Sequence, residues 1–196
     1  MAETRVPLIL AAALEEFARN GFNATRIDDI ANRAGLSKGG FYAHFASKEV
    51  LFEILLRREL SAPLLDVGRI LDGTQDIRQV IKQLVEVLGT KLLEPKASIV
   101  MRLLLSDGWR LPGVMQPRYQ QAMSSVLSEI ESLLQQCVEG GLCKDGGLCR
   151  QPRFILSPFI HAMVQQLVPG GVETLVVDQM KQDLVEILEE VLYPDF

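Results

Sequence analysis

Apolar residues recur every three or four positions along almost the whole chain, the spacing that places side chains on one face of an α-helix. Leu10, Leu14, Phe17 and Ala18 form one such stripe near the N-terminus. No segment shows the alternation of apolar and polar residues that is typical of a half-buried strand. The pattern predicts an all-α fold, with helices over about residues 4–19, 26–33, 37–43, 47 to 63 or 68, 75–93, 96–109, 115–138, 152–168 and 173–192.

Turn and cap residues separate the first four of these helices. Asn20-Gly21-Phe22 resembles a left-handed glycine cap followed by an apolar residue that packs back on the helix. Thr25, Ser37 and Ser47 are candidate N-caps of the three helices that follow. Because about three residues separate the two short helices, this region has the spacing of a helix-turn-helix.

Composition narrows the class of protein. The chain has 196 residues, of which 48% are hydrophobic and 23% charged, as expected of a folded globular protein. The apolar N-terminal run carries Glu15 and Glu16 and no signal-type cleavage site, and no other segment approaches a membrane span. We therefore expect a cytoplasmic protein that does not enter a membrane.

The charges are unevenly distributed. The net charge of −5 by itself argues against a nucleic-acid partner. Residues 1–48, however, carry six Lys and Arg against five Asp and Glu, whereas residues 49–196 carry fourteen against twenty. The acidic excess therefore lies outside the N-terminal region.

Cations directly follow the three candidate caps, as Thr25-Arg26, Ser37-Lys38 and Ser47-Lys48. A helix N-terminus offers free N–H groups and a partial positive charge, so a Lys or Arg beside it suits a phosphate. Each site alone is equally well explained as a solvated cation beside an acidic neighbour, but three within 24 residues indicate a polyanion. For Lys48, we expect its loss to flatten the salt dependence of binding to such a polyanion by about one unit of slope.

The stretch LSKGGFYAHFASKE, residues 36–49, places two glycines in the first turn of a predicted helix. Each costs about 1 kcal/mol relative to alanine in a helix interior. In a helix-turn-helix the second helix presents its N-terminal residues to the major groove, where the absence of side chains lets the backbone approach DNA. Phe41 and Phe45 anchor the other face, while Tyr42 and His44 project elsewhere, toward DNA or as ordinary surface residues.

These features are parts of longer motifs. Residues 17–56 contain F-x-x-N-G-F-x-A-T, I-A-x-x-A-G-L-S-K-G and F-Y-x-H-F-x-S-K-E, and the segment resembles the DNA-binding domain of the TetR family of bacterial transcriptional regulators. The resemblance implies a homodimer that binds a palindromic operator in double-stranded DNA, most often as a repressor that a small-molecule effector releases. It also implies two domains, an N-terminal three-helix helix-turn-helix DNA-binding domain at 1–48 and a larger C-terminal helical ligand-binding and dimerisation domain at 49–196.

The family's DNA contacts can be carried over position by position. They fall on Thr25, Arg26, Ser37, Lys38, Gly39, Tyr42, His44 and Lys48. Gly40 departs from the family pattern, because many relatives have Ala, Thr or Ser there. The base preference of the recognition helix is therefore left open.

Residues 49–196 carry no enzyme signature such as HExxH, GxSxG or a glycine-rich phosphate loop. We expect no enzyme, no cofactor and no metal site. Soft and aromatic side chains around the sixth and seventh predicted helices are candidates to line a pocket for a neutral or hydrophobic effector, although core packing explains them equally well. They are Met101, Leu105, Trp109, Met115, Tyr119 and Met123.

The last two predicted helices are rich in apolar residues. Paired with those of a second subunit they would form a four-helix dimer interface, as the resemblance also implies; the alternative is that they complete the core of one chain. The candidates are Phe154, Phe159, Met163, Leu184 and Leu188. The alternative function for the whole chain is a helical ligand-binding or scaffold protein that keeps the fold without operator recognition.

The three cysteines and Pro158 can each be interpreted in two ways. Cys137, Cys143 and Cys149 stand six residues apart without a CxxC pair, the last two in GGLCKDGGLC. A flexible surface loop is the simplest interpretation, with a metal or redox role as the less favoured one. Pro158 fits either the first turn of a helix capped by Ser157 or a kink in a helix begun at Pro152.

Overall fold

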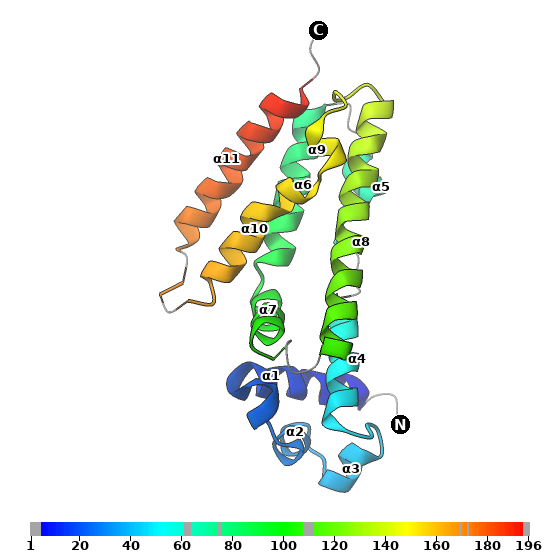
Figure 1. The fold of residues 1–196 in the computed structure, drawn as a ribbon, viewed down its shortest axis with the longest axis vertical. Helices are drawn as coiled ribbons and strands as arrows, with labels where there is room; N and C mark the ends of the chain where they lie inside the picture. The colour runs from blue at the N-terminus through cyan, green and yellow to red at the C-terminus, as the bar shows by residue number, and fades with distance from the viewer. Residues whose placement is uncertain are drawn as a thin grey trace. The chain divides into compact units, whose positions relative to one another are not determined.

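The structure of the chain is a computed structural model, which describes residues 5–60, 64–73, 76–107, 112–168, 170–171 and 173–193. All regular secondary structure in these ranges is helical (Figure 1), so the all-α prediction is confirmed. The described part of the chain forms eleven helices. They are α1 (Val6–Ala24), α2 (Ile27–Arg33), α3 (Lys38–Tyr42), α4 (Lys48–Leu60), α5 (Val67–Leu71), α6 (Ile77–Leu92), α7 (Pro95–Asp107), α8 (Pro112–Glu139), α9 (Gly147–Arg150), α10 (Arg153–Gln165) and α11 (Thr174–Leu192).

The short helices α5 and α9 were not predicted from the sequence. Each has only four or five residues, too few for a periodic pattern to show. Pro158 lies inside α10, which begins directly after Pro152, so the first-turn alternative is wrong. A proline cannot donate to the carbonyl four residues before it, and the neighbouring Ser157 hydroxyl donates to the carbonyl of Arg153 at 2.8 Å.

Packing divides the chain into two compact units. The first contains Met1–Ala62 and Ile99–Ala122, and the second contains Pro63–Ser98 and Met123–Phe196. These units of packing do not coincide with a single cut at residue 48, because α4 and most of α7 pack with α1–α3. The predicted division by function, with DNA binding at 1–48 and ligand binding and dimerisation at 49–196, stays a prediction.

The first unit has an aromatic core. The rings of Phe17 and Phe22 from α1 and of Phe52 from α4 lie with their centroids 4.6 to 5.6 Å apart. Phe41 and Phe45 belong to the same cluster and are buried. The predicted anchoring of the 37–43 helix by these two rings is therefore confirmed.

The second unit has a mainly aliphatic core. Helices α6, α10 and α11 pack side by side (Figure 1), and Phe159 is the one aromatic ring among the buried residues of that cluster. None of the described helices is both long and apolar enough to cross a membrane.

The cysteines belong to this second core rather than to an exposed loop. Cys137 and Cys143 are buried and Cys149 is half-buried, so the predicted surface loop is wrong for Cys143. The hydrogen bond with the Cys137 thiol and burial raise the pKa of Cys143, and burial raises the pKa of Cys149. No three His, Cys, Asp or Glu side chains in the described ranges form a group that could hold a metal ion.

Candidate DNA-binding site

Helices α2 and α3 form the predicted helix-turn-helix. Between them, the N–H of Leu36 donates to the carbonyl of Ala31 at 2.8 Å, and Gly35 has a φ of +68°, which favours glycine. The Ser37 hydroxyl accepts from the N–H of Gly40 at 3.1 Å, so the predicted cap of α3 is confirmed. With Phe41 buried beneath it, α3 keeps its opposite face exposed.

The cap-plus-cation pattern holds at two of its three predicted positions. Ser47 accepts from the N–H of Val50 at 3.2 Å and caps α4. Thr25 does not cap α2, because its buried hydroxyl donates to the carbonyls of Gly21 at 2.7 Å and Glu16 at 3.1 Å. The residue directly before α2 is Arg26, which makes no side-chain cap bond.

The structure brings most of the predicted DNA-contacting residues to one hollow of about 590 Å³ in the first unit. Its lining includes Thr25, Arg26, Lys38, Tyr42 and Lys48. The remaining predicted residues lie on or beside α3, where Ser37 and Gly39 are exposed and His44 is half-buried. The predicted set is thus gathered around α3 and the starts of α2 and α4.

The two lysines of this hollow have different surroundings. Lys38 is exposed and its ammonium lies 3.1 Å from a carboxylate oxygen of Asp28. Lys48 is half-buried, and its ammonium donates to the carbonyls of Phe22, Thr25 and Asn23 at 2.7, 2.8 and 3.2 Å. Burial lowers the pKa of Lys48 from its ordinary value.

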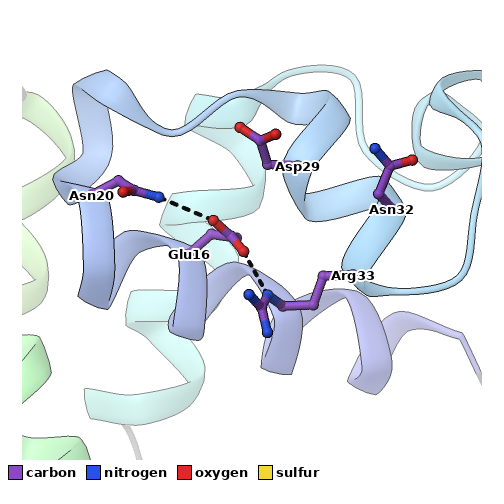
Figure 2. A pocket seen from close by; sticks show the side chains of 5 residues that line it. All are labelled: Glu16, Asn20, Asp29, Asn32 and Arg33. Carbon is purple, nitrogen blue, oxygen red and sulfur yellow. Dashed lines mark hydrogen bonds and ion pairs between the residues drawn. The ribbon is translucent and has the colours of Figure 1, made fainter.

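A second hollow, of about 670 Å³, shows how α2 is fixed on α1 (Figure 2). The buried Glu16 side chain points between Asn20 and Arg33, accepting from the amide of Asn20 at 3.1 Å and from Arg33 Nε at 2.5 Å. Arg33 also donates to Glu15 at 2.7 Å. The bond to Glu16 is the main cause of a raised pKa at Arg33. The bonds from Arg33 of α2 to Glu15 and Glu16 of α1 hold these two helices together.

Sequence reasoning missed the contribution of α7 to this region. Asp107, the last residue of α7, is buried and accepts from the N–H of Phe22 and from the side-chain amide of Asn23, each at 3.3 Å. Arg102 donates to the carbonyl of Ala18. More than 80 residues of sequence separate these partners, and neither residue belongs to a local motif that could have marked it.

The predicted effector-binding residues are not gathered in one place. Met115 is buried in the core of the first unit, whereas Met123 packs on the core of the second. Leu105 and Tyr119 are exposed, Met101 is half-buried, and Trp109 lies outside the described residues. The three described pockets are lined by other residues, and the effector site stays a prediction.

The predicted interface residues divide by burial. Phe159, Met163, Leu184 and Leu188 are buried within the second unit, as the monomer-core alternative describes, whereas Phe154 is 65% exposed. Other apolar side chains on or beside α10 and α11 are exposed. They are Val164, Val168, Leu175, Val176, Ile187 and Val191.

Comparison with known proteins agrees with the helix-turn-helix geometry. The activator FasR of Mycolicibacterium smegmatis is 40% identical over 78 residues, which are 40% of this chain and 36% of FasR. The regulator SrpR of Pseudomonas putida is 31% identical over 143 residues, which are 71% of this chain and 64% of SrpR. In both cases the chain spans less than two thirds of the relative's length.

Solved structures share the whole fold. A protein from Mesorhizobium loti assigned to the TetR family has a TM-score of 0.85 at 20% identity, covering 99% of both chains. A regulator from Saccharomonospora viridis in complex with choline has a TM-score of 0.78 at 24% identity over the full length of both. Residues 9–55 match the family model described as "Bacterial regulatory proteins, tetR family". Residues 9–55 therefore form the helix-turn-helix domain of the TetR family of bacterial regulatory proteins, and the chain as a whole has the fold of solved structures assigned to that family.

Proposed function

We propose that this protein is a cytoplasmic, ligand-responsive transcriptional repressor that binds a palindromic operator as a homodimer. The recognition helix is α3, and its exposed N-terminal end enters the major groove. Lys38 and Arg26 bind phosphates, while Tyr42, 48% exposed, lies on the face turned to DNA.

The observation that carries this proposal is the room around Gly39. Beyond the backbone of its own helix, a Cβ at this position would meet only the Ser37 hydroxyl, at 3.9 Å. The fold therefore has space for the methyl group of alanine here, and glycine lowers the helix propensity without a packing benefit. A close approach of DNA to the α3 backbone explains the glycine.

Dimer formation is supported by the exposed apolar side chains of α10 and α11. Leu175 is 78% exposed and Ile187 is 55% exposed, and both lie in the unit that contains the aliphatic core. Apolar side chains that recur on exposed helix faces are typical of a surface that another protein covers. A second copy of this chain would supply two more such helices and complete a four-helix interface.

The proposal also includes a response to a small-molecule effector and repression of transcription. The Saccharomonospora viridis regulator with bound choline supports a small organic effector, although choline is a cation and our expectation is a neutral or hydrophobic molecule. FasR is an activator by name, so the sign of regulation has to be measured. An effector releases the operator only if it binds the DNA-free form more tightly than the DNA-bound form.

Selection of bound duplexes from a random DNA pool at near-physiological salt tests operator binding. We expect enrichment of an inverted repeat, and Lys38→Ala or Tyr42→Ala should then weaken binding to it by about 1 to 3 kcal/mol. Failure to enrich any sequence would overturn operator recognition and favour the scaffold alternative.

Glycine substitutions give a matched comparison for the recognition face. Gly39→Ala should weaken operator binding at least about tenfold, the effect of roughly 1.4 kcal/mol, without lowering the melting temperature. Gly113 lies in the first turn of α8 and has no atom within 4 Å of a built Cβ, so Gly113→Ala should leave binding unchanged. Equal binding by the two variants would contradict our assignment of α3.

A further inference from the structure

We propose that Lys48 and Asp107 are positioning residues that together hold the turn linking α1 to α2, and that Lys48 is not a phosphate contact. The inference rests on the proposed DNA binding, and it replaces our sequence-based expectation for Lys48. The turn comprises residues 21–26, directly before the helix-turn-helix: the last four residues of α1, which begin at its break at Gly21 (φ of +72°), and the two residues before α2.

The ammonium of Lys48 is fully occupied by the turn. A lysine has three N–H donors, and the carbonyls of Phe22, Thr25 and Asn23 accept at 2.7, 2.8 and 3.2 Å. The same ammonium lies 4.6 Å from the centroid of the Phe22 ring, a distance at which a cation is attracted to the ring face. A phosphate could be bound only by giving up one of these contacts.

Asp107 accepts hydrogen bonds from two donors of the same turn. Its carboxylate accepts from the N–H of Phe22 and from the side-chain amide of Asn23 at 3.3 Å, and from the Ser106 hydroxyl at 2.9 Å. Phe22 and Asn23 are thus bound by both residues: Lys48 donates to their carbonyls, and Asp107 accepts from the backbone N–H of Phe22 and the side-chain amide of Asn23. A turn held through both acceptors and donors has little freedom to shift.

The position of this turn controls the position of the helices after it. Helix α2 begins at Ile27, two residues after the last carbonyl that Lys48 binds. Base and phosphate contacts need side chains placed within a fraction of an ångström. Loosening the turn should therefore weaken every contact of the recognition helix together, without removing a particular phosphate contact.

Salt dependence distinguishes a positioning residue from a phosphate contact. Each lost phosphate contact reduces the slope of log K against log salt by about one. We would measure binding by fluorescence anisotropy on a duplex selected by the protein, for Lys48→Met and for the matched variant Lys38→Met. Lys48→Met should lower affinity at least about tenfold at every salt concentration with the slope unchanged, whereas Lys38→Met should reduce the slope by about one. A slope reduced by one in Lys48→Met, or unchanged affinity, would overturn the inference.

Asp107→Asn tests the contribution of Asp107 to holding the turn. Asparagine keeps the shape but has a single acceptor oxygen, so we expect several-fold weaker binding with the slope unchanged. Glu53→Gln is the matched control, because that carboxylate binds Arg118 at 2.7 Å in the same unit and should not affect affinity. The double variant Lys48→Met with Asp107→Asn should show a fold-loss in affinity for the duplex that is smaller than the product of the fold-losses of the two single variants. Losses that multiply would mean that the two residues do not act on one turn.

A readout without DNA separates this inference from the proposed function. In both single variants, amide resonances of residues 22–28 should shift and exchange with solvent faster than in the wild type, while those of Glu53→Gln should not. Unchanged resonances would overturn the positioning role. If the wild type binds no duplex, the proposed operator binding fails, while the amide measurement still decides whether Lys48 and Asp107 hold the turn.

Discussion

The two units of this protein use buried polar groups in different ways. The first unit buries Glu16, Thr25 and Asp107, and each has hydrogen-bond partners at the ends of α1 and α2. No polar or charged residue of the second unit is buried among those described. A buried polar group is costly unless its partners are correctly placed, so it restricts the structure to one arrangement. The buried polar groups therefore lie in the unit that carries the helix-turn-helix, where they fix the backbone at the ends of α1 and α2.

The units also differ in where their exposed apolar residues lie. The first collects its phenylalanines into one buried cluster and exposes apolar residues scattered over different helices, such as Leu8 on α1 and Leu105 on α7, whereas the second exposes several along α10 and α11. An apolar residue that is buried within one chain contributes to folding, and an exposed one contributes when another molecule covers it. Equivalent substitutions in the two units should therefore have different consequences.

The largest expected effect is the loss of an aromatic ring from the first core. Phe52 is fully buried against Phe17 and Phe22, so Phe52→Ala should lower the free energy of unfolding by about 3 to 5 kcal/mol. Phe154, 65% exposed in the second unit, is the matched residue. Urea unfolding of both variants at one protein concentration would measure the difference. An equal loss in the two variants would contradict the contrast between the cores.

An intermediate effect is expected at the exposed face of α11. If that face forms the dimer interface, Ile187→Glu should weaken dimerisation by about 2 kcal/mol, roughly 30-fold, because it places a charge among apolar contacts. Analytical ultracentrifugation over a range of concentrations would measure this, with circular dichroism to verify folding. Leu105→Glu, at an exposed position on α7 in the first unit, should leave the dimer intact. A dimer that resists Ile187→Glu would place the interface elsewhere.

The smallest expected effect concerns a surface ion pair of the second unit. Glu86 accepts from Lys181 at 2.5 Å, and this hydrogen bond lowers the pKa of the carboxyl group. The folded state therefore binds the proton less tightly than the unfolded state, so the stabilisation is present above the ordinary pKa and is lost as the pH falls through the lowered value. Glu86→Gln should cost about 0.5 kcal/mol at neutral pH, because exposed pairs contribute little.

Varying the salt concentration gives a control for the predicted effect of this ion pair. Because both groups reach solvent, about 1 M salt should screen most of the interaction. The wild type and Glu86→Gln should then have nearly the same free energy of unfolding. Unfolding free energies of the two proteins, measured across the acidic range, should also converge below the lowered pKa. A difference that persists at low pH would show that the substitution acts through packing.

Local patterns placed most helix ends within a few residues, although α4 ends at Leu60 rather than near Pro63 or Gly68, and they did not identify every cap. Ser37 and Ser47 cap the helices that follow them, because a cap needs only a hydroxyl and an N–H three residues further on. Thr25 has the same local sequence context, yet its hydroxyl donates to carbonyls of α1. Those acceptors come close to Thr25 only after the chain has turned at Gly21. The sequence shows that Thr25 has a hydroxyl that can form a hydrogen bond, but the tertiary structure determines which group it bonds to.

The interface and effector residues could not be predicted for a related reason. A helical stripe of apolar residues shows that one side of a helix will be covered, without showing what covers it. On α11, Leu184 and Leu188 are buried by their own chain whereas the neighbouring Ile187 is exposed. In the same way, Met115 and Met123 follow one helical pattern along α8 but pack on the cores of different units.

The sequence by itself determined the helical fold, the helix-turn-helix and its family, and the cation Lys38 at the start of the recognition helix. These properties depend on residues within a few positions of one another, where helix geometry fixes the distances. Only the tertiary structure decided that Lys48 binds the carbonyls of the turn and that Asp107 binds its donors. Packing brings Asp107 to Phe22 across 85 positions of sequence. A local helical pattern relates only residues a few positions apart, so it cannot predict this contact.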